Sequence, residues 1–546
     1  MGYGVLPLTH CQLSIVNCPL FMLHSKWIKF FCIFLLGLGI LLRFTNLGLK
    51  FYWADEVRTS MRVSGYTETQ VIEQLYTDRP IAAPTLQAYH FPTKETDFGD
   101  TLAALKSHPE HPPLYYTLTR YWVQFWMRWF DDSVAVTRSL SALISLLVFP
   151  CLYWFCRELF ESPMVAWISM GIFAISPLHL LYAYEARQYS LWTVAILLSN
   201  AALLRAMRLS REGNTGQKSV LAWGFYGFSV ALGCYSHLFF VLVAIAQGIY
   251  VLLLERARFK AIVIPYLASA VAGFVAFSPW IWVIITNTGQ ISRVISEGTS
   301  ELSIDFLINR WFRNINRVFF NTDLTSFNFI LTFFAFYTLY FVLRRAPKSV
   351  WLLFVAIIGV NALSIMLPDA ILGGRRSSGV RYLFPSYIHI QILVAYCFTT
   401  QMTRLKTWKQ QIWQFGAIAI LVAGAVACIT ESQQEITWSK SNDKAEYYIP
   451  AAEVISTYER PLVLSDAPPI QILTLSYRLS PQAHLILSEQ PNLPPIPDGF
   501  DPILFLNPSP AWKAAIRSTP NWQLETLVER REEAEHELKL YRLNRG

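Results

Sequence analysis

Charged residues are scarce in this chain. Asp, Glu, Lys and Arg make up 15% of its 546 residues, whereas a soluble globular domain has about 25%. Hydrophobic residues make up 53%, with 18 Trp, 26 Tyr and 37 Phe. This composition excludes an ordinary soluble domain. The net charge of +8 does not indicate nucleic-acid binding, because the basic residues are scattered between apolar segments.

Several patterns that carry chemistry are also missing. All eight cysteines lie at or before Cys428, and they form neither a disulfide framework nor a Cys-x-x-Cys metal pattern. No GxxxxGK[ST] loop is present, which argues against direct use of ATP. Internal repeats and low-complexity runs are absent as well.

What the chain does have is a series of apolar segments of roughly 17–25 residues, the length of a membrane-spanning helix. We expect an all-α polytopic membrane domain at 27–429, with about eleven spans near residues 27–47, 134–159, 164–181, 190–209, 220–235, 238–254, 262–285, 327–343, 350–367, 383–402 and 412–429. The first span is too long for a signal peptide and lacks a small-residue cleavage site. Residues 1–26 are expected to be a cytoplasmic segment, with Met22 as an alternative start.

Basic residues in the short loops predict the orientation. They cluster at 205–218, 256–260, 344–348 and 404–409. With eleven spans these loops share one face, which the positive-inside rule makes cytoplasmic. The loop 48–133 and the tail after residue 430 are then extracytoplasmic, in a multi-pass protein of the plasma (inner) membrane.

The segment 114–129 is apolar but short, with Arg120 in its middle. One helical face would carry Tyr115, Leu118, Trp122, Phe125, Trp126 and Trp129, and the other Thr117, Arg120, Gln124 and Arg128. An amphipathic helix of this kind is expected to lie in the membrane interface. Counting it as a span would invert the loop charges.

The tail, residues 430–546, has a different pattern. Short β-rich runs predict strands at 461–466, 485–487, 503–506, 522–529 and 537–543, with helices at 470–479 and 511–517. We expect a small extracytoplasmic α/β domain.

Two adjacent carboxylates, Asp55 and Glu56, follow the first span where it meets water. Such a pair is costly at a membrane surface unless it is paired or functional. The simpler alternative is a solvated helix end, or an ion pair with Arg58 or Arg62.

A second outer connection contains Glu185 and Arg187, after Ser176-Pro177-Leu178-His179. It again combines a carboxylate with an arginine. The alternative interpretation is an aromatic belt with one surface ion pair.

The run His108-Pro109-Glu110-His111 precedes Pro112-Pro113. Its prolines exclude a regular helix, so the spacing is not that of a helical His-x-x-His metal site. A divalent metal site and a plain turn into the next helix both stay open.

The segment 373–385 combines three glycines and two serines with Arg375, Arg376 and Arg381. Guanidinium groups on a flexible loop suit an anionic ligand, because they bind phosphate in a bidentate manner. Lipid headgroup binding and an ordinary outer loop are the alternatives. A further loop at 309–321 would add Arg310, Arg313 and Arg317.

Carboxylates and arginines together at one face fit transfer from a phosphate-linked donor. The arginines would hold the phosphate, while a carboxylate removes a proton from an acceptor hydroxyl or amine. Phosphate leaves readily, so no general acid is required. In-line attack would invert the anomeric carbon.

These motifs, in this order, resemble the GT-C superfamily of integral membrane glycosyltransferases, within the protein O-mannosyltransferase and aminoarabinose-transferase group. The resemblance covers about residues 27–405. It rests on runs that begin at Trp53 (WADE), His111 (HPPLYY), Arg138 (RSLSAL), Ser176 (SP, then YEARQY from Tyr184) and Arg381 (RYLFP).

The resemblance implies a hexosyl or pentosyl transferase that uses a polyprenyl-phosphate sugar and a lipid, glycan or protein acceptor. It implies that Asp55 is the base, with Glu56 in support and Glu185 as a further catalytic candidate, although many members have Asp at that position. The expected donor-phosphate ligands are Arg187, Arg375, Arg376, Arg381 and Tyr382. The expected substrate-binding residues are His111 and Tyr189. Membrane lipids are further expected partners, and nucleic acid is not.

Two other functions compete with this one. A transporter or flippase of lipid-linked sugars would also need a polar cavity, but it would be expected to carry ionisable residues near the middle of the membrane and paired repeats. A scaffold whose tail binds partners would leave the carboxylates and the arginine loop unexplained.

The orientation is testable with a fusion after Arg545. Eleven spans place this end outside the cytoplasm, so a reporter that is active only outside the cytoplasm should show activity there. A fusion after Arg211, in a predicted cytoplasmic loop, is the control and should be inactive. Activity of a cytoplasm-only reporter at Arg545 would contradict the predicted parity.

Overall fold

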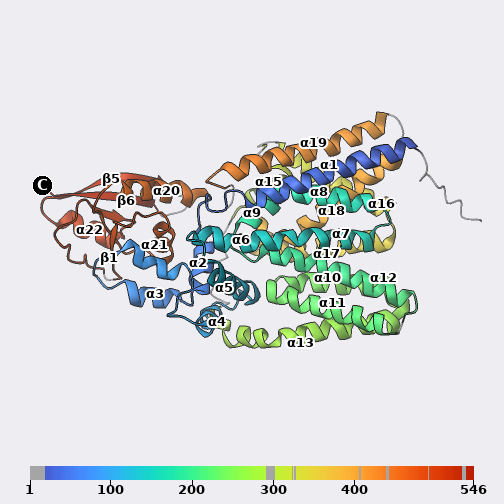
Figure 1. Ribbon diagram of the computed structural model, residues 1–546, viewed down its shortest axis with the longest axis horizontal. Coiled ribbons are helices and arrows are strands. Elements are labelled where there is room, and N and C mark those ends of the chain that lie inside the picture. The colour runs from blue at the N-terminus through green and yellow to red at the C-terminus, as the bar shows by residue number, and fades with distance from the viewer. Residues whose placement is uncertain are drawn as a thin grey trace, which may run out of the picture.

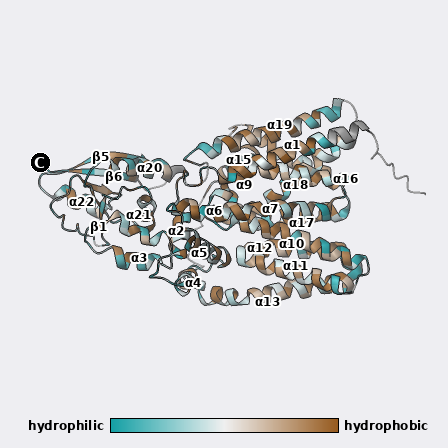
Figure 2. Cartoon of the chain, viewed as in Figure 1, coloured by the Kyte–Doolittle hydropathy of each residue, from teal (hydrophilic) through white to brown (hydrophobic). Residues whose placement is uncertain are grey.

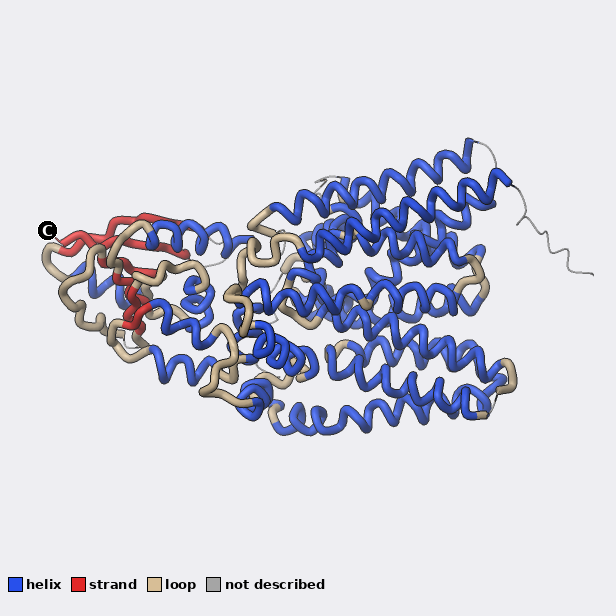
Figure 3. The backbone as a smooth tube through the Cα atoms, in the orientation of Figure 1, coloured by secondary structure: helices blue, strands red, loops and turns tan. Residues whose placement is uncertain are grey.

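The computed structural model describes residues 19–214, 216–290, 302–321, 324, 327–404, 408–437, 442–489, 491–531 and 537–545. Long helices lie side by side in one lobe, and all the strands lie in a second lobe that contains the C-terminus (Figures 1 and 3). Hydrophobic residues colour most of the helical lobe, with hydrophilic ones toward its two ends (Figure 2). The protein is therefore a mostly helical membrane protein with a separate mixed-sheet lobe.

The bundle helices coincide with the eleven predicted spans. They are α1 (Pro19–Phe44), α6 (Ser133–Leu146) with α7 (Val148–Leu159), α8 (Pro163–Ala174) with α9 (Pro177–Tyr184), α10 (Tyr189–Arg211), α11 (Gln217–Ser236), α12 (Phe240–Glu255), α13 (Ile264–Thr286), α16 (Phe329–Arg345), α17 (Lys348–Leu372), α18 (Phe384–Arg404) and α19 (Trp408–Gln433). Within the described residues, seven helices are long and apolar enough to span a membrane, or eight if the bent pair α8–α9 is one span. Spanning by α11, α12 and α16 stays a prediction.

The bend between α8 and α9 is 57° and has a local cause. Pro177 lacks an N–H and disfavours a helical conformation at Ser176, whose ψ is 120°. The Ser176 hydroxyl donates to the Val318 carbonyl (2.6 Å), which holds the break inside the bundle. His179, which the sequence placed at the outer face, is instead buried, with its ring stacked on Phe173.

The predicted loop at 309–321 is mostly a helix, α15 (Ile304–Phe320). Its arginines recur at three- and four-residue spacing, which is helical periodicity rather than loop composition. Ser303 caps the helix by accepting a hydrogen bond from the Phe306 amide.

The outer loop after α1 forms short helices between the two lobes (Figure 1). They are α2 (Ala54–Val63), α3 (Glu68–Leu75), the 3₁₀ helix η2 (Ala83–Tyr89), α4 (Phe98–Lys106) and α5 (Leu114–Trp126). Further short turns are η3 (Arg256–Arg258), the π-helical turn η4 (Phe259–Val263), η6 (Arg376–Ser378) and η7 (Val380–Leu383).

Helix α5 presents an aromatic face outward, with Leu118, Tyr121, Phe125, Trp129 and Phe130 all exposed around it. Arg120 does not face solvent as the helical pattern suggested. It is buried, and it donates to the Val63 carbonyl, the Thr101 hydroxyl and the Thr96 carbonyl. The polar face of α5 therefore binds α2 and α4, while its apolar face suits the membrane interface.

The tail forms a mixed sheet of order β1-β3-β2-β4-β6-β5. The strands are β1 (Ile81–Ala82), β2 (Leu462–Ser465), β3 (His484–Leu487), β4 (Ile503–Leu506), β5 (Trp522–Arg531) and β6 (Glu537–Arg545), with helices α20 (Asn442–Ser456), α21 (Pro469–Ser476) and α22 (Pro510–Ser518). The central strands β3, β2 and β4 are parallel and fully covered on both faces. They read as continuous apolar runs for that reason.

Strand β1 comes from the outer loop, not from the tail, and pairs antiparallel with β3 through Ile81–Leu485 and Ala82–His484. The tail also shares a hydrophobic core with α2 and α3, in which Val57, Met61 and Val71 pack with Ile470 and Leu473. The aromatic ring of Tyr477 stacks on His90 with ring centroids 3.6 Å apart. The outer loop and the tail therefore support each other.

Candidate active site

Asp55 and Glu56 do not end the first span but begin a separate helix, α2. Both lie in its first turn, where the positive end of the helix dipole favours carboxylates. The two side chains point to different surroundings. Glu56 is fully buried, whereas Asp55 is 19% exposed.

Glu56 is held in a bidentate ion pair with Arg138 of α6, at 2.9 Å from Nε and 2.7 Å from Nη2. Its Oε1 also accepts a hydrogen bond from the Ala186 amide (2.8 Å). Arg138 in turn donates to the carbonyls of Leu47, Lys50 and Phe51. Charge-assisted pairs of this geometry are the strong ones, so Glu56 and Arg138 fix α2 relative to the bundle.

Asp55 lines a cleft of about 780 Å³ that we call the outer cleft. Its walls come from α2, α3, the turn at 107–111, Gln290 and the segment 375–382. Asp55 Oδ2 lies 2.5 Å from Arg381 Nη1, and Oδ1 lies 3.7 Å from Arg58 Nη1. The carboxylate that the sequence singled out therefore meets the arginine loop, 326 residues later, across this cleft.

Asp55, which lines the cleft, and Glu185, which is buried outside its lining, have opposite pKa shifts. Burial alone would raise the pKa of Asp55, but the charges of Arg381, Arg187 and Arg58 and the hydrogen bond from Arg381 lower it below its ordinary value. Burial, reinforced by the charge of Glu56, raises the pKa of Glu185 well above 4.5. The environment favours an ionised Asp55 and a protonated Glu185.

Arg187 helps to hold helix α2 in place. Its Nη1 donates to the Asp55 carbonyl, the Thr59 hydroxyl and the Tyr116 hydroxyl, each at 3.2 Å. Tyr189 is also buried, with its ring against Tyr182 and Phe384. These residues do not line the outer cleft, and neither do Glu56 and Glu185, whereas Asp55, His111, Arg375, Arg376, Arg381 and Tyr382 do.

Sequence reasoning did not assign Arg58 and Arg62 to the site and treated them only as ion-pair partners. Arg58 does pair, with Glu68 Oε1 at 3.0 Å and more loosely with Asp55. Arg62 lines the cleft without such a pair. The helical spacing of positions 55, 58 and 62 is the signal that could have placed all three on one face of α2.

The turn with two histidines also lines the cleft. Glu110 Oε1 lies 3.2 Å from His108 Nδ1 and 3.7 Å from His111 Nε2. Trp280 Nε1 donates to the Pro109 carbonyl and ties the turn to α13. Among the residues described by the structure, no group of three or more His, Cys, Asp or Glu side chains could hold a metal ion.

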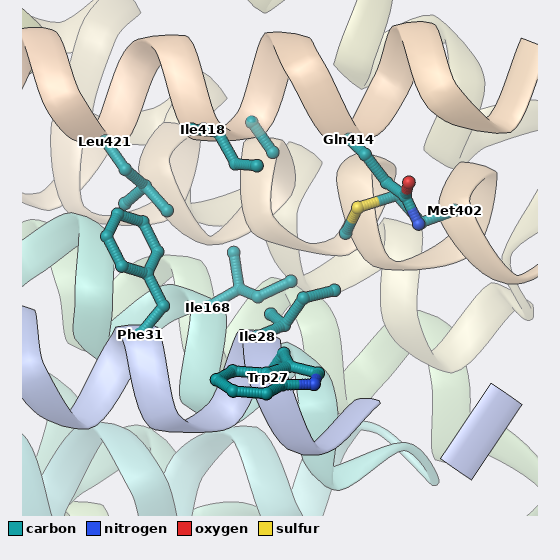
Figure 4. Close-up of a pocket in the computed structure, with 9 residues that line it drawn as sticks. Trp27, Ile28, Phe31, Ile168, Met402, Gln414, Ile418 and Leu421 are labelled. Atoms are coloured by element: carbon teal, nitrogen blue, oxygen red, sulfur yellow. The ribbon is translucent and has the colours of Figure 1, made fainter. Parts of the chain in front are cut away.

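A second cavity, of about 450 Å³, lies between α1, α8, α18 and α19. Figure 4 shows Trp27 and Phe31 on one side of it, and Ile418 and Leu421 on the other. Among the described residues that line it, Gln414 is the one amide, and none is titratable. The cavity lies near the N-terminal end of α1, away from Asp55.

The comparisons with known proteins agree with the fold. The family model described as dolichyl-phosphate-mannose-protein mannosyltransferase matches residues 110–283. ArnT from Cupriavidus metallidurans bound to undecaprenyl phosphate has a similar structure, with a TM-score of 0.52, 12% sequence identity and coverage of 95% of this chain and 98% of that one. Its apo state gives a TM-score of 0.51 and 11% identity, with the same coverage.

The apo oligosaccharyltransferase of Archaeoglobus fulgidus, at a TM-score of 0.46 and 12% identity over 85% of this chain and 64% of that one, is too distant to support an argument. Comparison with curated protein sequences gives no match. The resemblance to the GT-C superfamily is confirmed by the family match and the ArnT-like fold. Asp55 and Arg381 lie outside the matched segment, so their roles rest on the geometry.

Replacing Glu56 should destabilise the protein. Glu56→Gln leaves the charge of Arg138 buried without its partner, which typically costs about 3–5 kcal/mol. Thermal unfolding of the purified protein in detergent should show a clearly lower midpoint. Glu68→Gln, which breaks the partly exposed pair with Arg58, is the control and should change stability by about 0–1 kcal/mol. Equal midpoints for the two variants would contradict this role of Glu56.

Glu185 should make stability depend on pH. Because the pKa of Glu185 is raised in the folded protein, the folded state keeps a proton that the unfolded chain loses above about pH 4.5. Stability therefore falls as pH rises above that value. Glu185→Gln removes this loss, so its unfolding midpoint should exceed that of wild type by more at pH 8 than at pH 5. Glu489→Gln, at an exposed position, should show no such trend, and a parallel pH profile for Glu185→Gln would refute the assignment.

Proposed function

We propose that this protein transfers a sugar from a polyprenyl-phosphate-linked donor to an acceptor at the extracytoplasmic face, with Asp55 as the base and inversion at the anomeric carbon. The observation that carries the proposal is the position of Asp55. An ionised carboxylate faces a polar cleft whose other wall contains Arg375, Arg376 and Arg381. The confirmed family resemblance supplies the class of donor.

The proposed reaction balances with these groups alone. The acceptor oxygen attacks the anomeric carbon and forms the new glycosidic bond, while the bond from that carbon to the phosphate oxygen breaks. The proton of the acceptor goes to Asp55. The polyprenyl phosphate leaves with the electron pair, and the guanidinium groups stabilise its charge.

Arg381 connects the base and the leaving group. It pairs with Asp55, and its Nε is buried without a hydrogen-bond partner in the described part of the chain. A donor phosphate beside Arg381 would share that guanidinium with Asp55. Because the charge of Arg381 is the largest influence that lowers the pKa of Asp55, this sharing would strengthen Asp55 as a base once the donor is bound.

The other carboxylates fit supporting roles. Glu185 favours its neutral form, so it is a poor candidate for the base. Glu56 is fully occupied by Arg138 and the Ala186 amide, and we assign it to positioning α2. Enzymes often separate the roles of neighbouring carboxyl groups in this way.

The test is complementation of a deletion strain. Loss of the transferase should make an unconsumed polyprenyl-phosphate sugar accumulate, and wild-type protein should clear it. Asp55→Asn keeps the size of the side chain but removes its basicity, which typically lowers the rate about 10²–10⁴-fold. The donor should therefore persist at full protein expression.

Asp131→Asn, at an exposed position outside the cleft, is the matched control and should clear the lipid like wild type. Clearance by Asp55→Asn would move the base to another residue. Absence of any accumulated polyprenyl-phosphate sugar in the deletion strain would argue against the proposed donor class and in favour of a different function, such as transport.

A further inference from the structure

Arg62 is a buried cation with unused hydrogen-bond donors. It lies in the last turn of α2 and is 2% exposed. Its Nε and Nη1 have no hydrogen-bond partner among the described residues, yet its side chain lines the outer cleft. An arginine buried without a partner is expensive, because its hydration is lost and nothing replaces it. Such a residue indicates a ligand that completes the site.

His111 lines the same cleft, and the charge of Arg62 acts on its ring. Its Nδ1 is buried without a partner in the described part of the chain. Burial and then the charges of Arg62 and Arg187 lower the pKa of His111 well below 6.5, so the ring is neutral at pH 7. A neutral imidazole still carries one N–H, which an anion beside Arg62 could accept.

Arg62 and Asp55, the proposed base, lie at different positions along the axis of α2. Arg62 follows Asp55 by seven positions, which corresponds to roughly 10 Å along the helix axis. Arg381 contacts Asp55 at the other end of this distance. Arg381 is the arginine that pairs with Asp55, whereas Arg62 enters the cleft from a position about two turns further along α2.

We propose that Arg62 and His111 form a second anion subsite, which binds a phosphate or carboxylate group of the acceptor. The inference rests on the proposed function and adds the class of acceptor, a hydroxyl compound with a negative charge near the reacting group. The subsite holds the acceptor by its charge while Asp55 receives the proton about two helical turns away.

The experiment uses full-length protein in detergent, saturated with undecaprenyl phosphate so that the donor-phosphate site is filled. Binding of inorganic phosphate and, separately, of glucuronate is then measured by calorimetry. Wild type should bind one of these anions, and the one that binds identifies phosphate or carboxylate as the recognised group. Arg62→Gln should weaken that binding roughly ten- to hundredfold, the usual range for a charge-assisted hydrogen bond.

Arg79→Gln, at an exposed position of the same outer loop, is the matched control and should bind both probes like wild type. Undecaprenyl phosphate itself should bind Arg62→Gln as tightly as wild type. Arg62→Lys, which keeps the charge, serves if the glutamine variant does not fold, and it should bind the anion more weakly than wild type with undecaprenyl phosphate binding unchanged.

Three results would overturn the inference. They are failure of both anions to bind the saturated wild type, equal anion binding by wild type and the Arg62 variant, and a parallel loss of undecaprenyl phosphate, which would place Arg62 in the donor site. A failure of the proposed function would give a different result in the binding measurement. Wild type would then not bind undecaprenyl phosphate at all.

Discussion

The position of α2, and with it the outer cleft, depends on the buried ion pair between Glu56 and Arg138. It joins α2 to α6, and through Arg138 it also binds three carbonyls of the segment that follows α1. Through Ala186 it reaches the turn between α9 and α10. Three parts of the chain that are distant in sequence therefore meet at one carboxylate. This arrangement also positions Asp55, the preceding residue of the chain, in the cleft.

The tail lobe supports the same helix from the other side. Helix α21 packs on α2, and Tyr52 of the connecting segment lies between Ser60 and Tyr477. None of the residues that line the outer cleft comes from the tail. Within the described residues, the tail thus acts on the site through α2 and α3, which makes a positioning role more consistent with the structure than direct contact with the sugar.

The hydrophobic pattern was enough to predict the bundle helices and the strands β2 to β6, because those elements are specified by their own residues. The pattern failed where contacts with residues distant in the sequence determine the local structure. Arg120 looked like a solvent-facing residue of an amphipathic helix, but three oxygens of neighbouring segments bind it. Strand β1 has two residues and no signal of its own, and it exists only because β3 offers a free edge.

The same division applies to the site. Motif order brought Asp55 and the arginine loop to attention, and the structure places Asp55 beside Arg381. The difference between Asp55 and Glu56 was not readable from two adjacent letters, since it depends on which neighbour each carboxylate meets. Arg62 was overlooked for a related reason. A sequence does not show whether the N–H groups of an arginine will have hydrogen-bond partners in the folded protein.

The pairing of β1 with β3 also has a consequence for biosynthesis. About 400 residues separate Ala82 from His484, its partner in the sheet. During translation, α2 and α3 emerge long before the strand and core residues that cover them. The outer loop must therefore remain incompletely packed until almost the whole polypeptide has been synthesised. A prematurely terminated chain could insert most of its helices and still lack a finished cleft. Because the tail is synthesised last, incomplete molecules do not form the site.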